Sequence, residues 1–590
     1  MELNTLLVKR AHSLYTNLMP EKSRAKLLAG VLVVLGAVIF GAGINWGLPS
    51  HDIDRYLFPQ SATTAVNAWN LTGVGIVRLT GGMNQNGDLP ADMAAHRIGD
   101  RSQPIVLLEN LPGVSNPSDD VMRARILSRY RLYSFQPDEM ISFRALASMH
   151  PGKLQFDPKL YQYGGLWIYP LGAIVKAASL LGYVPITSDP TFYLDSPAMF
   201  GRFYVLGRAY SAAWGIVAAL AVFAMVHKAT GKRMLGWIAA LGFMCMPVVL
   251  DLAHEAKPHL AGTALMLLAI LAAWKYVETG GWKWIVWTAI ACGASAAMVL
   301  SGIVALVILP IMLLVRRDRA GRIFSACLAG FGIAAAVYFA ANPYVAIHLL
   351  GDPAVLRANL ANTRAMYPAG GNASMFGNAL QLLLAGTSLP LAVFSLLWML
   401  LAVFIKRGAS IRGLCWLVGV PAGIVLVQFV LFAAGKPGEY GRFALFADTA
   451  ILLAGFISIA RVLRHTVFQA AAALVILIFT IMHSGAYERG FLADAGAGNS
   501  RMEAAEVIDQ QLTGSSPVLY ITAEPAPYCL PPVNLFRWRM ILLPRGGEVP
   551  RGYPRGLLVR PHQAIGLMDP NSTPISWANI GFDMAEVGGK

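Results

Sequence analysis

Long apolar runs alternate with short polar segments over most of this chain. The first run, residues 27–46, contains 20 residues, enough for roughly 30 Å of helix and one crossing of a bilayer. Ten further apolar runs follow, at approximately 203–226, 234–252, 259–277, 283–300, 302–316, 323–341, 377–405, 413–433, 443–461 and 467–484. The pattern predicts a polytopic α-helical membrane protein with about 11 transmembrane helices.

The apolar stretch 166–184 differs from the other apolar runs. It contains Pro170 and Lys176, and whether it crosses decides the side on which every later loop lies. Basic loops follow it at 228–233, 316–322, 406–412 and 461–465. Cytoplasmic loops carry an excess of Lys and Arg, and all four can be cytoplasmic only if 166–184 does not cross. We therefore expect an interfacial or re-entrant helix there.

The same rule sets the sides of the termini. Residues 1–26 are basic and are predicted to be cytoplasmic. With an odd number of spans, the C-terminus lies outside, together with the long polar loop 47–161. The transmembrane domain then covers 27–484, and the loop and the interfacial helix belong to it.

Hydropathy falls after residue 484. Residues 500–511 have the spacing of an amphipathic helix, and 518–522, 540–543 and 556–559 are typical of buried strands. These elements predict a small extracytoplasmic α/β domain over residues 485–590.

Composition supports a membrane protein and changes the interpretation of charge. Hydrophobic residues make up 56% of the chain and charged residues 13%, which excludes a soluble protein of this length. The formal net charge of +15 comes from basic residues in short loops between apolar runs, so we do not expect nucleic-acid binding.

An adjacent acidic pair, Asp138-Glu139, lies in the long first loop. A carboxylate can accept a proton from an acceptor hydroxyl during group transfer, and a neighbouring carboxylate can orient it or hold a divalent cation. The alternative is a helix N-terminus, where acidic residues offset the positive end of the helix dipole. Spacing alone leaves both interpretations open.

A second polar group lies at an outward turn between two predicted spans. It places five ionisable residues within nine positions: Asp251, His254, Glu255, Lys257 and His259. Such residues are costly at membrane depth unless they face water, a partner or a ligand. Helical spacing would put Asp251, His254 and Glu255 on one face. We expect a site for a phosphate and its counter-charge, with a solvated turn as the alternative.

A third group, residues 435–443, lies at a late outward turn. Arg442 begins one span and Lys436 ends the previous one. Arginine matches phosphate oxygens with two parallel donors, and lysine adds a point charge. Side chains reaching the interface are the alternative, and it is stronger for Lys436. Arg208, at the outer end of an earlier span, is either an anion ligand or an interface anchor.

The order of these motifs resembles the GT-C superfamily of membrane glycosyltransferases, in the branch with protein O-mannosyltransferases and the aminoarabinose transferases of lipid A. The resemblance covers about residues 27–480. Its markers are Gly47-Leu48-Pro49, Pro137-Asp138-Glu139, the run from Tyr163 to Pro170, Arg208, the segment His254 to Pro258, and Tyr440 to Arg442.

The resemblance implies a function and its residues. Asp138 would be the general base, and Glu139 its supporting or metal-contacting neighbour, with Mg²⁺ or Mn²⁺ as a possible cation. The donor would be a polyprenyl-phosphate-linked sugar, whose phosphate is held by Lys257, Arg442 and His254. The acceptor, whether lipid, glycan or protein, is not specified. The resemblance also implies a bacterial inner membrane.

This sequence departs from the family pattern in one respect. In many relatives the acidic pair follows the first helix closely, whereas here an insertion of about 75 residues intervenes and Asp52 occupies the near position. Asp52 is therefore the alternative base. Asp138 is preferred because the downstream aromatic run with Tyr163, itself a further site candidate, follows it in family order.

Two other classes of function compete with a transferase. A transporter or flippase of lipid-linked sugars would place ionisable residues at mid-bilayer and would favour paired halves. A non-catalytic scaffold would leave the outer charged groups without a purpose. The charged residues of this sequence collect at the outer ends of the predicted spans, which favours the enzyme.

Overall fold

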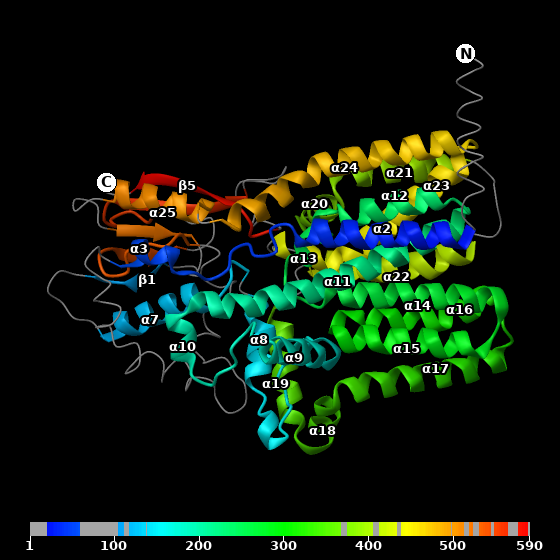
Figure 1. Ribbon diagram of the computed structural model, residues 1–590, viewed down its shortest axis with the longest axis horizontal. Coiled ribbons are helices and arrows are strands. Elements are labelled where there is room, and N and C mark those ends of the chain that lie inside the picture. The colour runs from blue at the N-terminus through cyan, green and yellow to red at the C-terminus, as the bar shows by residue number, and fades with distance from the viewer. Residues whose placement is uncertain are drawn as a thin grey trace, which may run out of the picture.

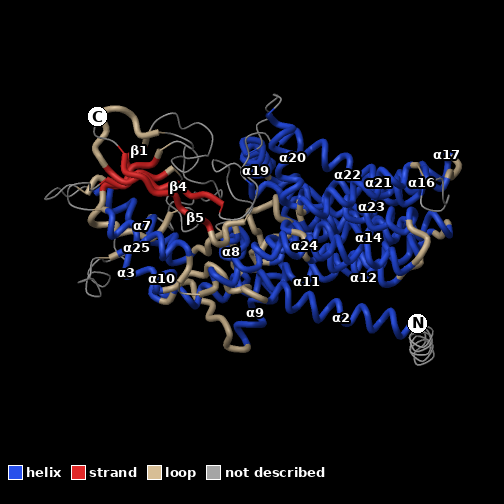
Figure 2. Tube along the Cα trace, turned by 90° about the horizontal axis from the view of Figure 1, so that it is seen from above, coloured by secondary structure: helices blue, strands red, loops and turns tan. Residues whose placement is uncertain are grey.

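A helical bundle with a small β-sheet unit at one end makes up the protein (Figure 1). The computed structural model describes residues 21–58, 104–110, 117–136, 138–366, 374–404, 412–432, 438–496, 498–512, 518–522, 530–543, 548–563 and 576–587. Figure 2 shows the strands gathered at one end of the molecule, and helices filling the remainder. The predicted fold class, a polytopic helical protein with a small C-terminal α/β unit, is confirmed.

The bundle helices coincide with the apolar runs of the sequence. They are α2 (Glu21–Gly41), α11 (Pro197–Thr230), α12 (Arg233–Met244), α13 (Pro247–Ala253), α14 (His259–Thr279), α15 (Trp282–Met298), η3 (Leu300–Val307), α16 (Ile308–Arg316), α17 (Ala320–Ala341), α20 (Ser374–Thr387), α21 (Leu389–Val403), α22 (Arg412–Phe432), η5 (Gly438–Ala444), α23 (Leu445–Val462) and α24 (Thr466–Asp494). Each predicted span therefore corresponds to helical structure.

By length and composition, six of the described helices are suited to cross a membrane, or up to eight if two bent pairs each count as one span. The bent pairs are α12–α13, with a 64° bend, and α20–α21, with a 98° bend. Pro247 opens α13, and a proline there cannot continue the preceding helix because it lacks an N–H. The apolar helices at 25–41, 165–180 and 300–316 are shorter. This count is lower than the eleven predicted spans because some of the predicted spans are bent and others form helices that are too short to be counted.

Four further helices are α8 (Glu139–Ala147), α9 (Gly165–Leu180), α18 (Pro343–Gly351) and α19 (Pro353–Met366). Helix α9 covers most of the stretch predicted to be interfacial and is one of the shorter apolar helices. It packs against α8, α11 and α15 through buried residues such as Trp167 and Leu171.

The sheet has five strands in the order β1-β3-β2-β4-β5. Strands β2 (Val518–Ile521), β3 (Arg539–Leu542) and β4 (Gly556–Gln563) are parallel, and they match the three predicted strands. The edge strands β1 (Ile105–Leu108) and β5 (Ile580–Val587) are antiparallel to their neighbours and were not predicted. The predicted amphipathic helix is α25 (Ser500–Gln511).

Part of the first loop belongs to the same unit as the C-terminal strands. Besides β1, the loop contributes η1 (His51–Ile53), α3 (Asp54–Leu57) and α7 (Pro117–Leu132), while α10 (Pro190–Asp195) packs on α7. Tyr130 of α7 donates its hydroxyl to the carbonyls of Leu530 and Pro531. The α/β unit is therefore assembled from two distant parts of the chain, and a division at residue 485 does not separate it.

A buried contact joins this unit to the first loop and the bundle. Arg501 of α25 makes an ion pair with Asp494 at the end of α24 and lies over the ring of Phe135, 3.8 Å from its centroid. The backbone of Gly47 connects the two sides, because its N–H donates to Asp494 and its carbonyl accepts from Phe135. The end of the first loop, just before Asp138, is thereby fixed.

The segment from Gln162 to Gly164 runs against the point where α15 gives way to η3. Tyr163 pairs with Val299 as an isolated bridge, and the N–H of Gly164 donates to the carbonyl of Met298 at 2.9 Å. A Cβ on Gly164 would lie 1.8 Å from the carbonyl oxygen of Ala297. Glycine is required here because the two backbones approach so closely.

Replacing Gly164 with Ala is therefore expected to destabilise the protein by about 1–3 kcal/mol, since the clash involves backbone that cannot rotate away. Thermal unfolding of the detergent-purified chain measures the loss. Gly152→Ala is the matched control, because nothing lies within 4 Å of its added Cβ. Equal melting temperatures for the two variants would contradict the expectation.

Candidate functional site

Asp138 lies at the N-terminal boundary of α8, but its side chain makes no hydrogen bond that caps the helix. Its Oδ2 atom lies 3.1 Å from Nη2 of Arg442 and 3.5 Å from Nζ of Lys257. The Asp138 side chain is 29% exposed, whereas that of Lys257 is fully buried. The carboxylate thus stands at the open side of a pair of buried cations.

Lys257 joins Asp138 to a second carboxylate. Its Nζ lies 3.0 Å from Oε2 of the buried Glu255, and Oε1 of Glu255 accepts a hydrogen bond from Gln136 at 2.5 Å. The oxygen of the Gln136 side chain accepts in turn from the backbone N–H of Asp138. Two carboxylates and two cations therefore form a cluster with no formal net charge, here called the Asp138 cluster: Asp138, Glu255, Lys257 and Arg442.

The surroundings set the charge of each loop residue in the cluster. Burial favours a higher pKa for Asp138, but Lys257 and Arg442 outweigh it, and the net pKa lies below the ordinary value. Burial raises the pKa of Glu255 despite the charge of Lys257. For Lys257, burial favours a lower pKa, but Glu255 and Asp138 reverse the direction and keep the ammonium charged.

Glu139 occupies a different environment from its neighbour Asp138. It is fully buried and forms a two-pronged ion pair with Arg208, with distances of 2.9 Å and 2.7 Å. Its oxygens also accept from the N–H of Ala256 at 2.8 Å and from the hydroxyl of Ser134 at 2.5 Å. Both oxygens of Glu139 are therefore engaged by the protein.

Arg208 extends this contact to the end of the first helix. Its Nη1 donates to the carbonyls of Ile44 and Trp46, at 2.8 Å and 2.7 Å. One ion pair thus holds together the turn after the first helix, the first loop, α11 and the turn after α13. The sequence left open whether Arg208 binds an anionic ligand or anchors the helix at the membrane interface. In the structure its side chain instead pairs with Glu139.

His254 is turned away from the Asp138 cluster. Its ring nitrogens lie 2.8 Å from the carbonyl of Leu250 and 2.7 Å from that of Ala42. The ring stacks on Phe491 with centroids 4.1 Å apart. The helical face predicted for Asp251, His254 and Glu255 does not form, because α13 ends at Ala253 and the chain turns there.

Tyr163 is buried beside the cluster. Burial raises its pKa, and the charges of Lys257 and Asp138 both act on its hydroxyl. Its ring meets His259 edge-on at 6.0 Å, and His259 meets Phe443 in the same way at 5.4 Å. An aromatic wall therefore borders the cations.

The remaining predicted residues lie elsewhere. Asp52 in η1 is exposed, and its Oδ2 accepts from the hydroxyl of Ser50 at 3.0 Å. Lys436 lies outside the described residues. Lys257 and Arg442, which are far apart in sequence, are brought to Asp138 and not to Asp52.

Gln136 is the member of the site that sequence reasoning missed. It is fully buried and connects Glu255 to the backbone of Asp138. A single glutamine beside an acidic pair carries no signal of such a role, because its partner Glu255 lies more than a hundred residues away.

The acidic pair does not fit a divalent cation. Such a cation prefers several carboxylate or carbonyl oxygens. Here Asp138 faces Lys257 and Arg442, and the Glu139 oxygens are engaged by Arg208, Ser134 and Ala256. Within the described residues, no group of three or more His, Cys, Asp or Glu side chains is arranged to hold a metal.

No protein-family model and no curated protein matches this chain. Among solved structures, ArnT from Cupriavidus metallidurans bound to undecaprenyl phosphate is similar, with 13% identity, a TM-score of 0.42, and coverage of 77% of this chain and 95% of that one. The same protein in the apo state has 13% identity and a TM-score of 0.43, with coverage of 75% of this chain and 91% of that one.

The archaeal oligosaccharyltransferase AglB from Archaeoglobus fulgidus, in complex with an inhibitory peptide and a dolichol-phosphate, gives 14% identity and a TM-score of 0.34, covering 68% of this chain and 60% of that one. Identities and TM-scores this low assign no function, so function has to be inferred from the site itself.

The two neighbouring acidic residues should respond differently to the loss of charge. Glu139→Gln would leave the Arg208 guanidinium buried without its carboxylate, which typically costs about 3–5 kcal/mol. Asp138→Asn changes a partly exposed side chain and should shift the melting temperature much less. Thermal unfolding of both variants in detergent tests this contrast, and equal shifts would contradict it.

Proposed function

We propose that this protein is a membrane glycosyltransferase, which moves a sugar from a polyprenyl-phosphate-linked donor to an acceptor hydroxyl at the end of the bundle that carries the sheet. The observation that carries the proposal is the Asp138 cluster: two buried cations, Lys257 and Arg442, converge on one partly exposed carboxylate. The donor class is the one that the GT-C resemblance implies, and the carboxylate is suited to accept the acceptor's proton.

Lys257 is suited to receive a phosphate. It makes ion pairs with Asp138 and Glu255, but its Nζ forms no hydrogen bond of good geometry with any described residue. An ammonium has three donors, so it retains capacity for phosphate oxygens. Arg442 adds a planar guanidinium whose geometry suits phosphate. A phosphate bound here would draw both cations away from Asp138.

Such a displacement would turn Asp138 into a stronger base. While Lys257 and Arg442 face it, the carboxylate has a low pKa and holds a proton poorly. A bound donor phosphate takes up their positive charge, and the pKa of Asp138 rises toward or above its ordinary value. Donor binding would therefore prepare the base before the acceptor reacts.

The transfer balances in charge and in atoms. The acceptor oxygen forms a bond to the anomeric carbon, the bond from that carbon to the phosphate oxygen breaks, and the acceptor's proton passes to Asp138. The leaving polyprenyl phosphate gains one negative charge while Asp138 loses one. Lys257 and Arg442 then face the phosphate alone, which stabilises the charge that develops in the transition state. Attack opposite the leaving phosphate would invert the anomeric centre.

The other predicted residues take positioning roles in this scheme. The Glu139–Arg208 ion pair fixes the start of α8, and therefore the place of Asp138. His254, held between two carbonyls and stacked on Phe491, fixes the turn that carries Glu255 and Lys257. We place the site and the sheet unit on the extracytoplasmic side of a bacterial inner membrane, where the sheet unit would help to select the acceptor.

A transporter of lipid-linked sugars is the second candidate, and the site does not favour it. The Asp138 cluster lies where the first loop, the turn after α13 and the last turn of η5 meet, at one end of the bundle. A carboxylate that faces two buried cations at one end of the bundle suits a reaction at that end better than transport of a substrate through the bundle.

Asp138→Asn is expected to lower the rate of transfer by a factor on the order of 10²–10⁴, because the proton acceptor is lost. Donor binding should be kept or strengthened, since the amide no longer competes for Lys257 and Arg442. Release of polyprenyl phosphate from candidate donors measures the rate. Asp52→Asn serves as the control and should remain active, whereas full activity of Asp138→Asn would refute the assigned base.

The pH dependence should differ between the free and the donor-bound enzyme. As pH falls through the pKa of Asp138, the carboxylate becomes protonated and activity is lost. In the free enzyme this pKa lies below the ordinary carboxyl value of about 3.9, so the acid limb of kcat/KM also lies below that value. Donor binding raises the pKa, so the acid limb of kcat should lie at higher pH. Initial rates measured across the acid range show which of the two acid limbs lies at higher pH. An acid limb of kcat at lower pH than that of kcat/KM would contradict the displacement of the cations.

A further inference from the structure

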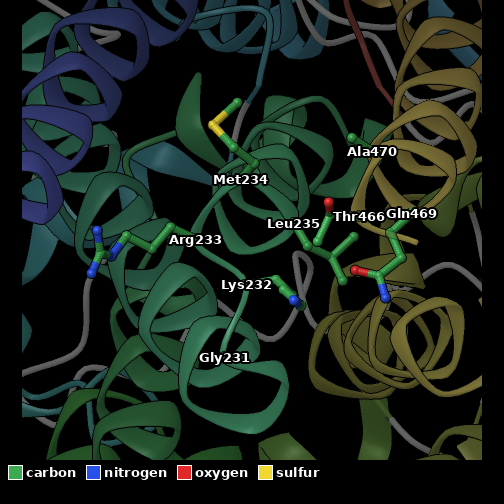
Figure 3. Close-up of a pocket in the computed structure, with 8 residues that line it drawn as sticks. All are labelled: Gly231, Lys232, Arg233, Met234, Leu235, Thr466, Gln469 and Ala470. Carbon is green, nitrogen blue, oxygen red and sulfur yellow. The ribbon is translucent and has the colours of Figure 1, made fainter. Parts of the chain in front are cut away.

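A cavity of about 330 Å³ with both polar and apolar walls lies at the opposite end of the bundle from the sheet, where α12 and α24 begin (Figure 3). Its walls are residues 231–235 and Thr466, Gln469 and Ala470. None of these belongs to the Asp138 cluster, and the proposed glycosyl transfer does not use them.

The beginning of α12 supplies hydrogen-bond donors to this cavity. The first N–H groups of a helix have no partner within the helix. Lys232, the residue before α12, makes no side-chain cap bond, so the N–H groups of Arg233, Met234 and Leu235 are not capped by it. An uncapped helix N-terminus next to a lysine favours an anion such as phosphate. The Arg233 side chain points away from the cavity (Figure 3).

A buried acceptor on α24 faces the same cavity. Gln469 is 3% exposed, and its Nε2 donates to the carbonyl of Leu463 at 2.9 Å. This bond fixes the amide, so Oε1 is directed into the cavity, as Figure 3 shows. Among the described residues Oε1 has no hydrogen-bond partner. A buried acceptor without a partner costs about 1–3 kcal/mol, which a ligand that donates a hydrogen bond would recover.

Exposed apolar side chains lie near the start of both helices. Met234, which lines the cavity, is 52% exposed, and Val467 and Phe468, between the lining residues Thr466 and Gln469 in sequence, are 73% and 61% exposed. Exposed apolar residues near a cavity that offers a lysine and a buried amide oxygen suit a ligand that has both a polar headgroup and hydrocarbon chains.

We propose that this cavity binds the headgroup of a phospholipid whose phosphate carries a hydrogen-bond donor, namely an ethanolamine ammonium or a glycerol hydroxyl. The phosphate contacts Lys232 and the first N–H groups of α12, the donor reaches Oε1 of Gln469, and the acyl chains lie against Met234, Val467 and Phe468. A phosphocholine headgroup has the same phosphate but no donor for Gln469, and binds more weakly.

Native mass spectrometry of the detergent-purified full chain tests the site without any activity assay. Dioleoyl phosphatidylethanolamine, phosphatidylglycerol and phosphatidylcholine are titrated separately. The first two are expected to bind on the order of tenfold more tightly than the third, because only they satisfy the buried acceptor. Equal affinity of the three lipids for the wild type would overturn the proposal.

Variants separate the parts of the site. Lys232→Gln should weaken all three lipids, whereas Gln469→Leu should abolish the preference among them. Ala470→Leu fills the cavity while leaving every polar group in place, and it should abolish the preference even if Gln469→Leu folds poorly. Lys283→Gln is the matched control, because Lys283 is an exposed lysine at the start of α15. If Lys283→Gln weakens binding as much as Lys232→Gln, the attraction is general surface charge, and the proposal fails.

Soluble glycerophosphoethanolamine distinguishes a lipid from a free phosphodiester. It has the same headgroup but no acyl chains to lie against Phe468 and its neighbours. We expect it to bind at least tenfold more weakly than the lipid, since the apolar contacts are lost. Equal affinity would refute the lipid as the occupant.

Discussion

The buried ion pair between Glu139 and Arg208 is the contact on which the geometry of the site depends. It joins the turn after the first helix, the first loop, α11 and the turn after α13, and both of its partners are fully buried. A buried ion pair is no great source of net stability, since desolvation offsets much of the attraction, but it tolerates few arrangements. Its effect is therefore to fix where α8 begins, and α8 begins at the residue after Asp138.

Two adjacent carboxylates thus acquire different roles from their surroundings. Glu139 has no exposed surface and no unengaged oxygen, so it serves as a structural anchor. Asp138, one residue earlier, is partly exposed and faces Lys257 and Arg442. The charges of Asp138, Glu255, Lys257 and Arg442 cancel, which allows four ionised groups to lie together at the edge of the bundle. A phosphate entering this cluster would redistribute the pairing, and the proposed chemistry follows from that redistribution.

The sheet unit and the site are mechanically connected. Arg501 and Asp494 lie under Phe135, and the backbone of Gly47 links Asp494 to the same loop segment. A change in the sheet unit would therefore alter the position of Phe135, three residues before Asp138. This connection gives a physical route by which an acceptor bound on the sheet unit would influence the base.

The sequence alone determined the helical bundle, the three central strands, and the candidates Asp138, Lys257 and Arg442. Apolar runs and strand patterns are local, and the energy of burying them depends on nearby composition. Only the tertiary structure separated Asp138 from Glu139, turned His254 toward Ala42, brought Gln136 to Glu255 and added β1 to a sheet of C-terminal strands. These outcomes rest on pairs of residues far apart in the chain, and no local pattern specifies which partner a buried polar group will find.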